Sequence, residues 1–183
     1  MKVPKLAWIV VGAVFAAGSV AIHYEVKIGM HRRSGSVHEL GRLKVSEPAP
    51  DFILQDLAGQ PVRLSSYRGR AVYIDFWATW CGPCRAALPG LQDLTDKFKD
   101  QGLEVVSIDE GEGLDQVRSF IDRRKYSFRV LLDTDRAVGD FYGVRGIPTS
   151  VLIDRSGVVQ SIAVGNVSPV EEIRKRFERM SKE

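Results

Sequence analysis

The sequence predicts an α/β fold, a three-layer sandwich in which a mixed central sheet carries helices on both faces. Residues 71–77 are rich in β-branched and aromatic residues, which is typical of a buried parallel strand. Apolar residues then recur at helical spacing from residue 83 onward, and residues 103–109 form a second candidate strand. A strand, a helix and a second strand in this order indicate a βαβ unit, from which such a sheet is built.

Length and composition suit a globular protein with one domain and an extension. The chain has 183 residues, of which 44% are hydrophobic and 27% are charged. Its formal net charge of +3 is too small to indicate nucleic-acid binding.

The extension begins with an apolar segment. Residues 6–22 contain no charged residue and follow Lys2 and Lys5, which favour a cytoplasmic N-terminus. The small residues Ser19 and Ala21 offer a cleavage site. Residues 1–24 are therefore interpreted either as an uncleaved single-pass membrane anchor or as a removable signal peptide. Both interpretations place the domain that follows on the extracytoplasmic side, and the second allows secretion.

Residues 25–47 are expected to form a linker, because they mix glycines, charges and isolated apolar residues without a sustained period. The folded domain is expected to span residues 48–183. All three histidines (His23, His31 and His38) precede that domain, and the chain has two cysteines. Since a zinc site needs about four ligands, no metal site is expected.

Local patterns predict the remaining elements of the domain. The predicted hairpins join residues 51–57 to 61–64 and residues 150–153 to 158–164. The predicted helices cover residues 114–125 and a C-terminal segment that opens at Ser168 with a capping box, and a strand is expected at 128–132.

The two cysteines form a C-x-x-C motif, Cys81-Gly82-Pro83-Cys84, at the junction of the central strand and its helix. Pro83 fits the first helical turn, so Cys81 is expected at the helix N-terminus, where free amides and the macrodipole stabilise a thiolate. Cys84 lies one turn further on and can close a disulfide with Cys81. The motif predicts an exposed nucleophilic sulfur and a sheltered resolving sulfur, against the alternative of an inert core pair.

Asp75 lies in the middle of the central strand, between Ile74 and Phe76, where side-chain alternation points it into the protein. A buried carboxyl group without a cationic partner has a raised pKa and can transfer protons near neutral pH. The alternative is an aspartate at the strand end that backbone amides satisfy.

These motifs resemble those of a known family. Residues 75–84, Asp-Phe-Trp-Ala-Thr-Trp-Cys-Gly-Pro-Cys, are similar to the active-site stretch of thioredoxins, and residues 143–149 resemble their cis-proline loop. The wider pattern, from about Pro48 to the C-terminus, resembles the membrane-anchored TlpA/ResA-like thiol-disulfide oxidoreductases. Its signs are Ala-Pro-Asp-Phe at 49–52, Leu-Ser at 64–65 and Leu-Asp-Thr-Asp-Arg at 132–136.

The resemblance implies a thioredoxin-like fold and assigns further roles. It places Asp75 beneath Cys84 for proton transfer. It implies a cis peptide bond before Pro148, which would face the disulfide, with the Ile147 backbone free to pair with an extended substrate. Trp80, with Gly82 and Pro83, would form part of the docking surface. For Trp77 the sequence leaves core packing and a place beside the cysteines equally open.

The chain also departs from the TlpA/ResA pattern. Those proteins commonly carry a glutamate three residues after the second cysteine, where this chain has Ala87, and they tend to lack the strand aspartate that stands here as Asp75. The predicted site is therefore thioredoxin-like, and a narrow substrate preference does not carry over.

The resemblance implies an extracytoplasmic protein-disulfide reductase that needs no bound cofactor beyond its Cys81–Cys84 disulfide. Its implied partners are protein disulfides, apocytochrome c among them, and a membrane thiol-electron transporter that supplies electrons. Two alternatives stand beside it: a peroxide-linked antioxidant and a non-catalytic thioredoxin-fold assembly factor. Ile74 and Ala78 argue against a peroxidase, because they stand where a peroxiredoxin motif has Pro and Thr or Ser.

Overall fold

A computed structural model describes residues 35–37, 39–165 and 170–180 of the chain. The strands are β1 (Gly35–Val37), β2 (Glu39–Leu40), β3 (Leu43–Lys44), β4 (Ile53–Asp56), β5 (Pro61–Arg63), β6 (Ala71–Trp77), β7 (Leu103–Glu110), β8 (Arg129–Asp133), β9 (Thr149–Ile153) and β10 (Val159–Val164). The helices are η1 (Leu64–Tyr67), α2 (Gly82–Phe98), η2 (Lys99–Gln101), α3 (Leu114–Arg124), α4 (Ala137–Tyr142) and α5 (Val170–Met180).

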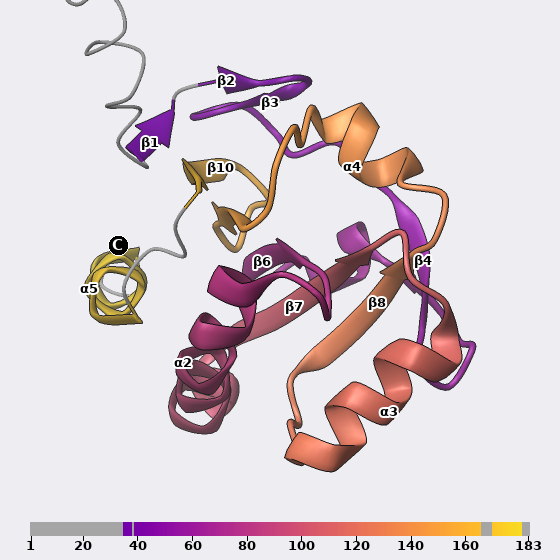
Figure 1. The fold of residues 1–183 in the computed structure, drawn as a ribbon. Helices are drawn as coiled ribbons and strands as arrows, with labels where there is room; N and C mark the ends of the chain where they lie inside the picture. The colour runs from indigo at the N-terminus through magenta and orange to yellow at the C-terminus, as the bar shows by residue number, and fades with distance from the viewer. Residues whose placement is uncertain (1–34, 38, 166–169, 181–183) are drawn as a thin grey trace, which may run out of the picture. The chain divides into compact units, whose positions relative to one another are not determined.

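The described strands form a mixed sheet of eight strands in the order β1-β10-β9-β6-β7-β8-β4-β5, with β2 and β3 as a separate hairpin (Figure 1). β6, β7 and β8 are parallel, and β9 runs antiparallel to β6. All seven residues of β6 are buried, because neighbouring strands flank it and apolar layers cover both of its faces. The predicted α/β sandwich and its central βαβ unit are confirmed.

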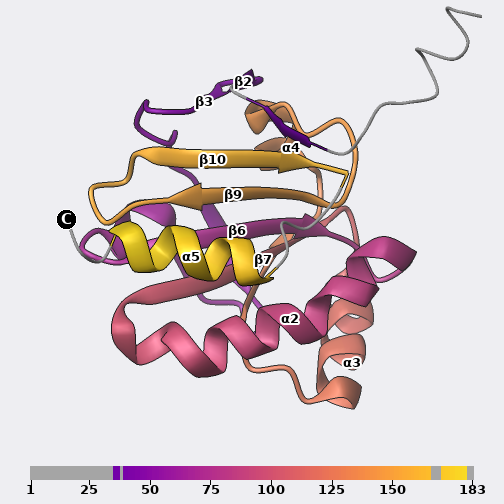
Figure 2. The same ribbon diagram turned by 90° about the vertical axis from the view of Figure 1, so that its left-hand side faces the viewer.

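Each face of the sheet carries its own apolar core. The face beneath α2, α3 and α5 buries Tyr73, Trp77 and both cysteines in one cluster. Figure 2 shows α2 and α5 crossing that face. The opposite face, beneath α4, buries Ile74 and Phe76 in a second cluster. The strict alternation along β6 sends every second side chain to each core, as a strand with two covered faces requires.

The expected linker is wrong for its described part, because the domain begins well before residue 48. β1 pairs antiparallel with β10, and the β2–β3 hairpin buries Leu43 completely. Ser46 donates its N–H to the Val159 carbonyl at 2.8 Å. The sequence could not show this, since β10 offers a row of unpaired backbone groups that any extended segment can pair with, whatever its side chains. Residues 25–34 and 38 lie outside the described part.

The hairpin docks through two glycines. Gly41, with φ +55°, lies so close to α4 that an added Cβ would meet the Tyr142 carbonyl oxygen at 2.5 Å and the Gly143 Cα at 2.6 Å. This close approach joins the β2–β3 turn to the start of the loop that leads to Pro148.

Gly41→Ala is therefore expected to destabilise the protein twice over. The left-handed conformation costs about 1–2 kcal/mol for a residue with a Cβ, and the backbone clash adds about 1–3 kcal/mol. Gly59→Ala is the matched control, because Gly59 has φ +75° but nothing within 4 Å of the added Cβ. Urea unfolding measures both variants, and an equal loss in the two would contradict the docking.

The C-terminal helix α5 closes one end of the covered face. Ile173 and Phe177 are buried, and the Phe177 ring lies 5.3 Å from that of Phe98 in α2. The predicted capping box begins at Ser168, outside the described residues. The apolar segment 6–22 also lies outside them, and within the described part no helix has the length and hydropathy to cross a bilayer.

Candidate active site

The Cys81–Cys84 motif lies where β6 ends and α2 begins. A turn joins the two elements, and the Cys81 N–H donates to the Ala78 carbonyl at 3.1 Å. Cys81 is the N-cap of α2, and its sulfur accepts the Cys84 N–H at 3.2 Å. The two cysteines form a disulfide, with their Cα atoms 5.3 Å apart. The predicted position of Cys81 at a helix N-terminus is confirmed, and the Cys84 amide that its sulfur accepts would also stabilise a thiolate there.

The surface at this point is made by the residues around the disulfide rather than by the sulfurs. Cys81 is 4% exposed and Cys84 is fully buried. The expectation of an exposed sulfur is wrong for this oxidised form, in which Cys81 is buried and bonded to Cys84. Gly82 and Pro83 are exposed, and Trp80 exposes 68% of its surface. A partner approaching the disulfide would meet these three residues first.

Trp77 is the opposite case. It is fully buried, and its ring packs 5.3 Å from that of Phe120 in α3. The structure therefore resolves the choice that the sequence leaves open for this residue: Trp77 belongs to the core, whereas Trp80 belongs to the surface.

Asp75 is fully buried on the same face of the sheet as Cys84, since it alternates with Tyr73 and Trp77 of that core cluster. The strand register places Ser107 and Ser150 on either side of it. Within the described residues neither carboxyl oxygen has a hydrogen-bond partner, which rules out the backbone-capped alternative there. Burial raises the pKa of Asp75 well above its ordinary value.

The Ile147–Pro148 peptide bond is cis, as predicted. Pro148 precedes β9, and because Thr149 pairs with Phe76, the loop lies at the edge of the sheet where β6 ends. Pro148 is buried, and its carbonyl accepts the Gly165 N–H at 2.8 Å. Ile147 is half-buried, and its backbone forms no hydrogen bond within the described residues. Its amide and carbonyl therefore remain available to an extended peptide.

Comparison with known proteins agrees with this geometry. The AhpC/TSA family matches residues 45–162. The thiol-disulfide oxidoreductase ResA of Geobacillus thermodenitrificans is 37% identical over 134 residues, which cover 73% of this chain and 76% of that protein. ResA of Bacillus subtilis is 38% identical over 130 residues, which cover 70% and 73%. The chain belongs to the ResA-like thiol-disulfide oxidoreductases.

Solved structures of thiol:disulfide interchange proteins share the fold of this chain. The crystal structure of a DsbE-like thiol:disulfide interchange protein from Chlorobium tepidum matches with a TM-score of 0.70 and 35% identity, over 76% of this chain and 99% of that one. A second thiol:disulfide interchange protein from the same organism matches with a TM-score of 0.61 and 31% identity, over 75% and 94%. The thioredoxin-like fold and the activity of a thiol-disulfide oxidoreductase are therefore confirmed.

Sequence reasoning missed a pair of acids beside the active-site turn. Glu112 follows β7 and is 7% exposed, and its carboxylate accepts hydrogen bonds from both the amide and the hydroxyl of Thr79. Its backbone N–H donates to Oδ1 of the buried Asp109 carboxyl group at 3.0 Å. The only sequence signal is a glutamate between Gly111 and Gly113 in a strand-to-helix loop, which says nothing about the residue that it contacts.

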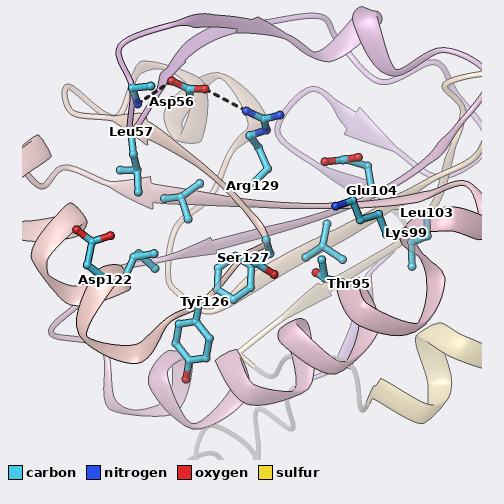
Figure 3. Close-up of a pocket in the computed structure, with 15 residues that line it drawn as sticks. Asp56, Leu57, Thr95, Lys99, Leu103, Glu104, Asp122, Tyr126, Ser127 and Arg129 are labelled. Carbon is cyan, nitrogen blue, oxygen red and sulfur yellow. Dashed lines mark hydrogen bonds and ion pairs between the residues drawn. The ribbon is translucent and has the colours of Figure 1, made fainter.

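A cavity of about 460 Å³ lies at the opposite end of the sheet (Figure 3). Leu103 and Glu104 line it at the start of β7, whereas the disulfide follows the end of the parallel strand β6. None of the predicted site residues lines this cavity. Within the described residues, no group of three or more histidines, cysteines or acids could hold a metal ion.

Proposed function

We propose that the protein reduces disulfide bonds in other proteins on the outer side of the cytoplasmic membrane. The observation that carries this proposal is the Cys81–Cys84 disulfide at the N-terminus of α2, with the Asp75 carboxyl group buried on the same face of the sheet and unpartnered among the described residues. This arrangement supplies an activated thiol, a resolving thiol and a group that can exchange their protons.

The proposed reaction starts from the reduced form. The Cys81 thiolate attacks a substrate disulfide, forms a mixed disulfide and releases one substrate thiolate, which takes up a proton. Cys84 then passes its proton to the ionised form of the Asp75 carboxyl group and attacks the Cys81 sulfur, which releases the second substrate sulfur as a thiolate that takes up a proton. Two electrons have passed from the enzyme to the substrate, the Cys84 proton has gone to Asp75, from which it can leave again, and the enzyme is left with the Cys81–Cys84 disulfide.

The surface residues fit a protein substrate. Trp80, Gly82 and Pro83 form an exposed apolar rim beside the disulfide. The amide and carbonyl of Ile147, which have no hydrogen-bond partner in the described part of the chain, can pair with an extended segment in the manner of an added strand, beside Pro148. We assign these five residues to substrate binding.

The direction of electron flow follows from the Gly-Pro dipeptide between the cysteines. It is shared with reducing thioredoxins, whose potential is about −270 mV. The resemblance to the ResA-like branch makes apocytochrome c cysteines a candidate substrate. A reductase outside the membrane needs a source of electrons, which a membrane thiol-electron transporter would supply, and residues 6–22 would anchor the chain or direct its export. No further cofactor enters the reaction.

The reduction potential of the purified full chain tests this proposal. Equilibration in dithiothreitol or glutathione buffers, followed by trapping of free thiols, is expected to give a potential of about −270 mV. The protein is also expected to reduce insulin in the presence of dithiothreitol. A potential of about −120 mV, that of a strong periplasmic oxidant, would reverse the proposed direction of electron flow. A chain that cannot turn over insulin at all would be a non-catalytic assembly factor.

A further inference from the structure

The turn that precedes α2 and ends at Cys81 is held by hydrogen bonds from a residue distant in the sequence. It runs from Ala78 to Cys81, closed by the Cys81 N–H bond to the Ala78 carbonyl, and Thr79 and Trp80 are its central residues. Its conformation sets two things at once: the place of the Cys81 sulfur at the helix end and the outward position of Trp80. A β-turn of this kind has no strong intrinsic preference for a single geometry, so an external contact can fix it.

Glu112 supplies that contact. Its Oε2 accepts the Thr79 backbone N–H, and its Oε1 accepts the Thr79 hydroxyl at 2.6 Å. Gln116, in the first turn of α3, donates to the same Oε1 and also to the Thr79 hydroxyl oxygen at 3.0 Å. Both polar groups of Thr79 that can donate are thus held by one carboxylate. Hydrogen bonds to an ionised acceptor are roughly twice as strong as neutral ones and fix direction as well as distance.

Asp109 accepts a hydrogen bond from the Glu112 backbone and so helps to position Glu112. It is fully buried at the end of β7, and its Oδ1 accepts the Glu112 backbone N–H at 3.0 Å. Burial raises the pKa of Asp109 to about 8, so Asp109 keeps its proton at neutral pH. The contact chain runs from the end of β7 through Glu112 to the turn between β6 and α2.

We propose that Glu112 is a positioning residue for thiol-disulfide exchange, acting through Thr79 to hold the Ala78–Cys81 turn in its reactive geometry. Within the described residues its carboxylate bonds to Thr79 and Gln116 and not to the sulfurs. Its effect is to keep Cys81 where the amides of α2 stabilise the thiolate, including the Cys84 N–H that its sulfur accepts at 3.2 Å. If the turn loosens, the thiolate loses part of that stabilisation, and the thiol reacts more slowly at neutral pH.

Thr79→Val tests the proposal with the least disturbance, because it removes the hydroxyl but keeps the shape, the backbone and the net charge. The reduced full chain is alkylated with iodoacetamide across a pH series, and modification of Cys81 is followed by peptide mass spectrometry. The rate at pH 7 is expected to fall about tenfold, the factor that one pKa unit makes in the thiolate fraction. Thr79→Ser, which restores the hydroxyl, is expected to return the rate to within about twofold of the native value, since its bond to Glu112 can form again.

Thr95→Val is the matched control. Thr95 is a buried threonine of α2 whose hydroxyl donates to the Leu91 carbonyl at 2.9 Å, away from the turn. Thr95→Val also removes one threonine hydrogen bond and can change stability, but it does not alter the Ala78–Cys81 turn. The reactivity of Cys81 in this variant should therefore equal that of the native chain. Equal Cys81 rates in Thr79→Val and Thr95→Val would overturn the proposal, because the loss would then be unspecific or absent.

A double-mutant cycle with Glu112→Gln separates positioning from charge. Removing the negative charge of Glu112 affects the Cys81 thiol through space to the same extent in both backgrounds, so this contribution cancels in the cycle. If Glu112 acts through Thr79, the effect of Glu112→Gln on the alkylation rate is smaller in the Thr79→Val background than in the native chain. Strict additivity would overturn the proposal. Should Glu112→Gln fail to fold, the comparison of valine with serine at position 79 decides by itself.

Discussion

Replacing Cys84 with serine is expected to arrest the enzyme as a mixed disulfide, whereas replacing Cys81 with serine is expected to reduce insulin turnover to the level of the buffer blank. The two sulfurs are not equivalent, because only Cys81 caps α2 and accepts the Cys84 N–H. Only a thiolate attacks a disulfide efficiently, and Cys84 is fully buried in the core beneath α2. Without Cys84, the first attack succeeds and nothing releases the substrate.

Mass spectrometry of the reaction mixture distinguishes the two variants. Cys84→Ser should accumulate a covalent adduct with the substrate that dithiothreitol removes, and Cys81→Ser should show none. Each variant also lacks the cross-link over a four-residue loop, worth about 2 kcal/mol in the chain-entropy description. The reduced native chain is therefore the proper reference for stability. If the adduct forms on Cys81→Ser instead, Cys84 is the nucleophile and Cys81 the resolving cysteine, which contradicts the assignment.

Asp75→Asn is expected to slow the resolving step about hundredfold or more at neutral pH, because a positioned general acid or base contributes about 10²–10⁴-fold. The amide keeps the size of the side chain but cannot take the proton of Cys84. The lifetime of the mixed disulfide, followed by quenched flow across pH, measures the effect. The native rate should show an ionisation that the variant lacks, and an unchanged pH–rate profile would reject the proton-transfer role.

The same substitution is expected to change how stability depends on pH. Burial raises the pKa of Asp75 in the folded protein, whereas in the unfolded chain an aspartate ionises at about 3.9. Between these two pKa values the native state holds a proton that the unfolded state has released. Stability therefore falls as pH rises through that window, by up to about 1.4 kcal/mol per pH unit. Asparagine removes this pH-dependent loss, so from about pH 4 upward the stability of the variant rises relative to that of the native protein.

Urea unfolding at a series of pH values measures the difference between the two curves. Asp133→Asn is the matched control: Asp133 is also a fully buried acid whose pKa is raised first of all by burial, but it lies at the end of β8, on the opposite face from Cys84. It is expected to change the stability curve and to leave the resolving step native. A slowed resolving step in both variants would show that burial of any acid in this sheet, rather than Asp75, affects the chemistry.

Much of the site was predictable from local sequence because its chemistry lies in one short segment. The strand residues 71–77, the C-x-x-C motif and Pro83 are contiguous, and their order alone places Cys81 at a helix N-terminus. Alternation along a doubly covered strand buries Asp75 without any knowledge of its neighbours. The cis bond before Pro148 followed from the resemblance of residues 143–149 to the cis-proline loop of thioredoxins.

The contacts that the sequence could not show join segments far apart in the chain. Glu112 meets Thr79 across 33 positions, and nothing in either local pattern names the other residue. The pairing of β1 with β10 joins backbone groups of two segments far apart in the chain, and residues 35–47 carried no strand signal. The burial of Trp77 depended on where α3 places Phe120, and Trp80, three positions on, is exposed.

The sequence by itself therefore determined the fold class, the redox motif and the buried acid, since each follows from periodicity or spacing within a single element. Only the tertiary structure decided where the domain begins, which tryptophan faces solvent and what holds the active-site turn. Those outcomes depend on which surfaces and unpaired backbone groups the folded sheet brings together, and residues adjacent in space but distant in sequence leave no local pattern to read.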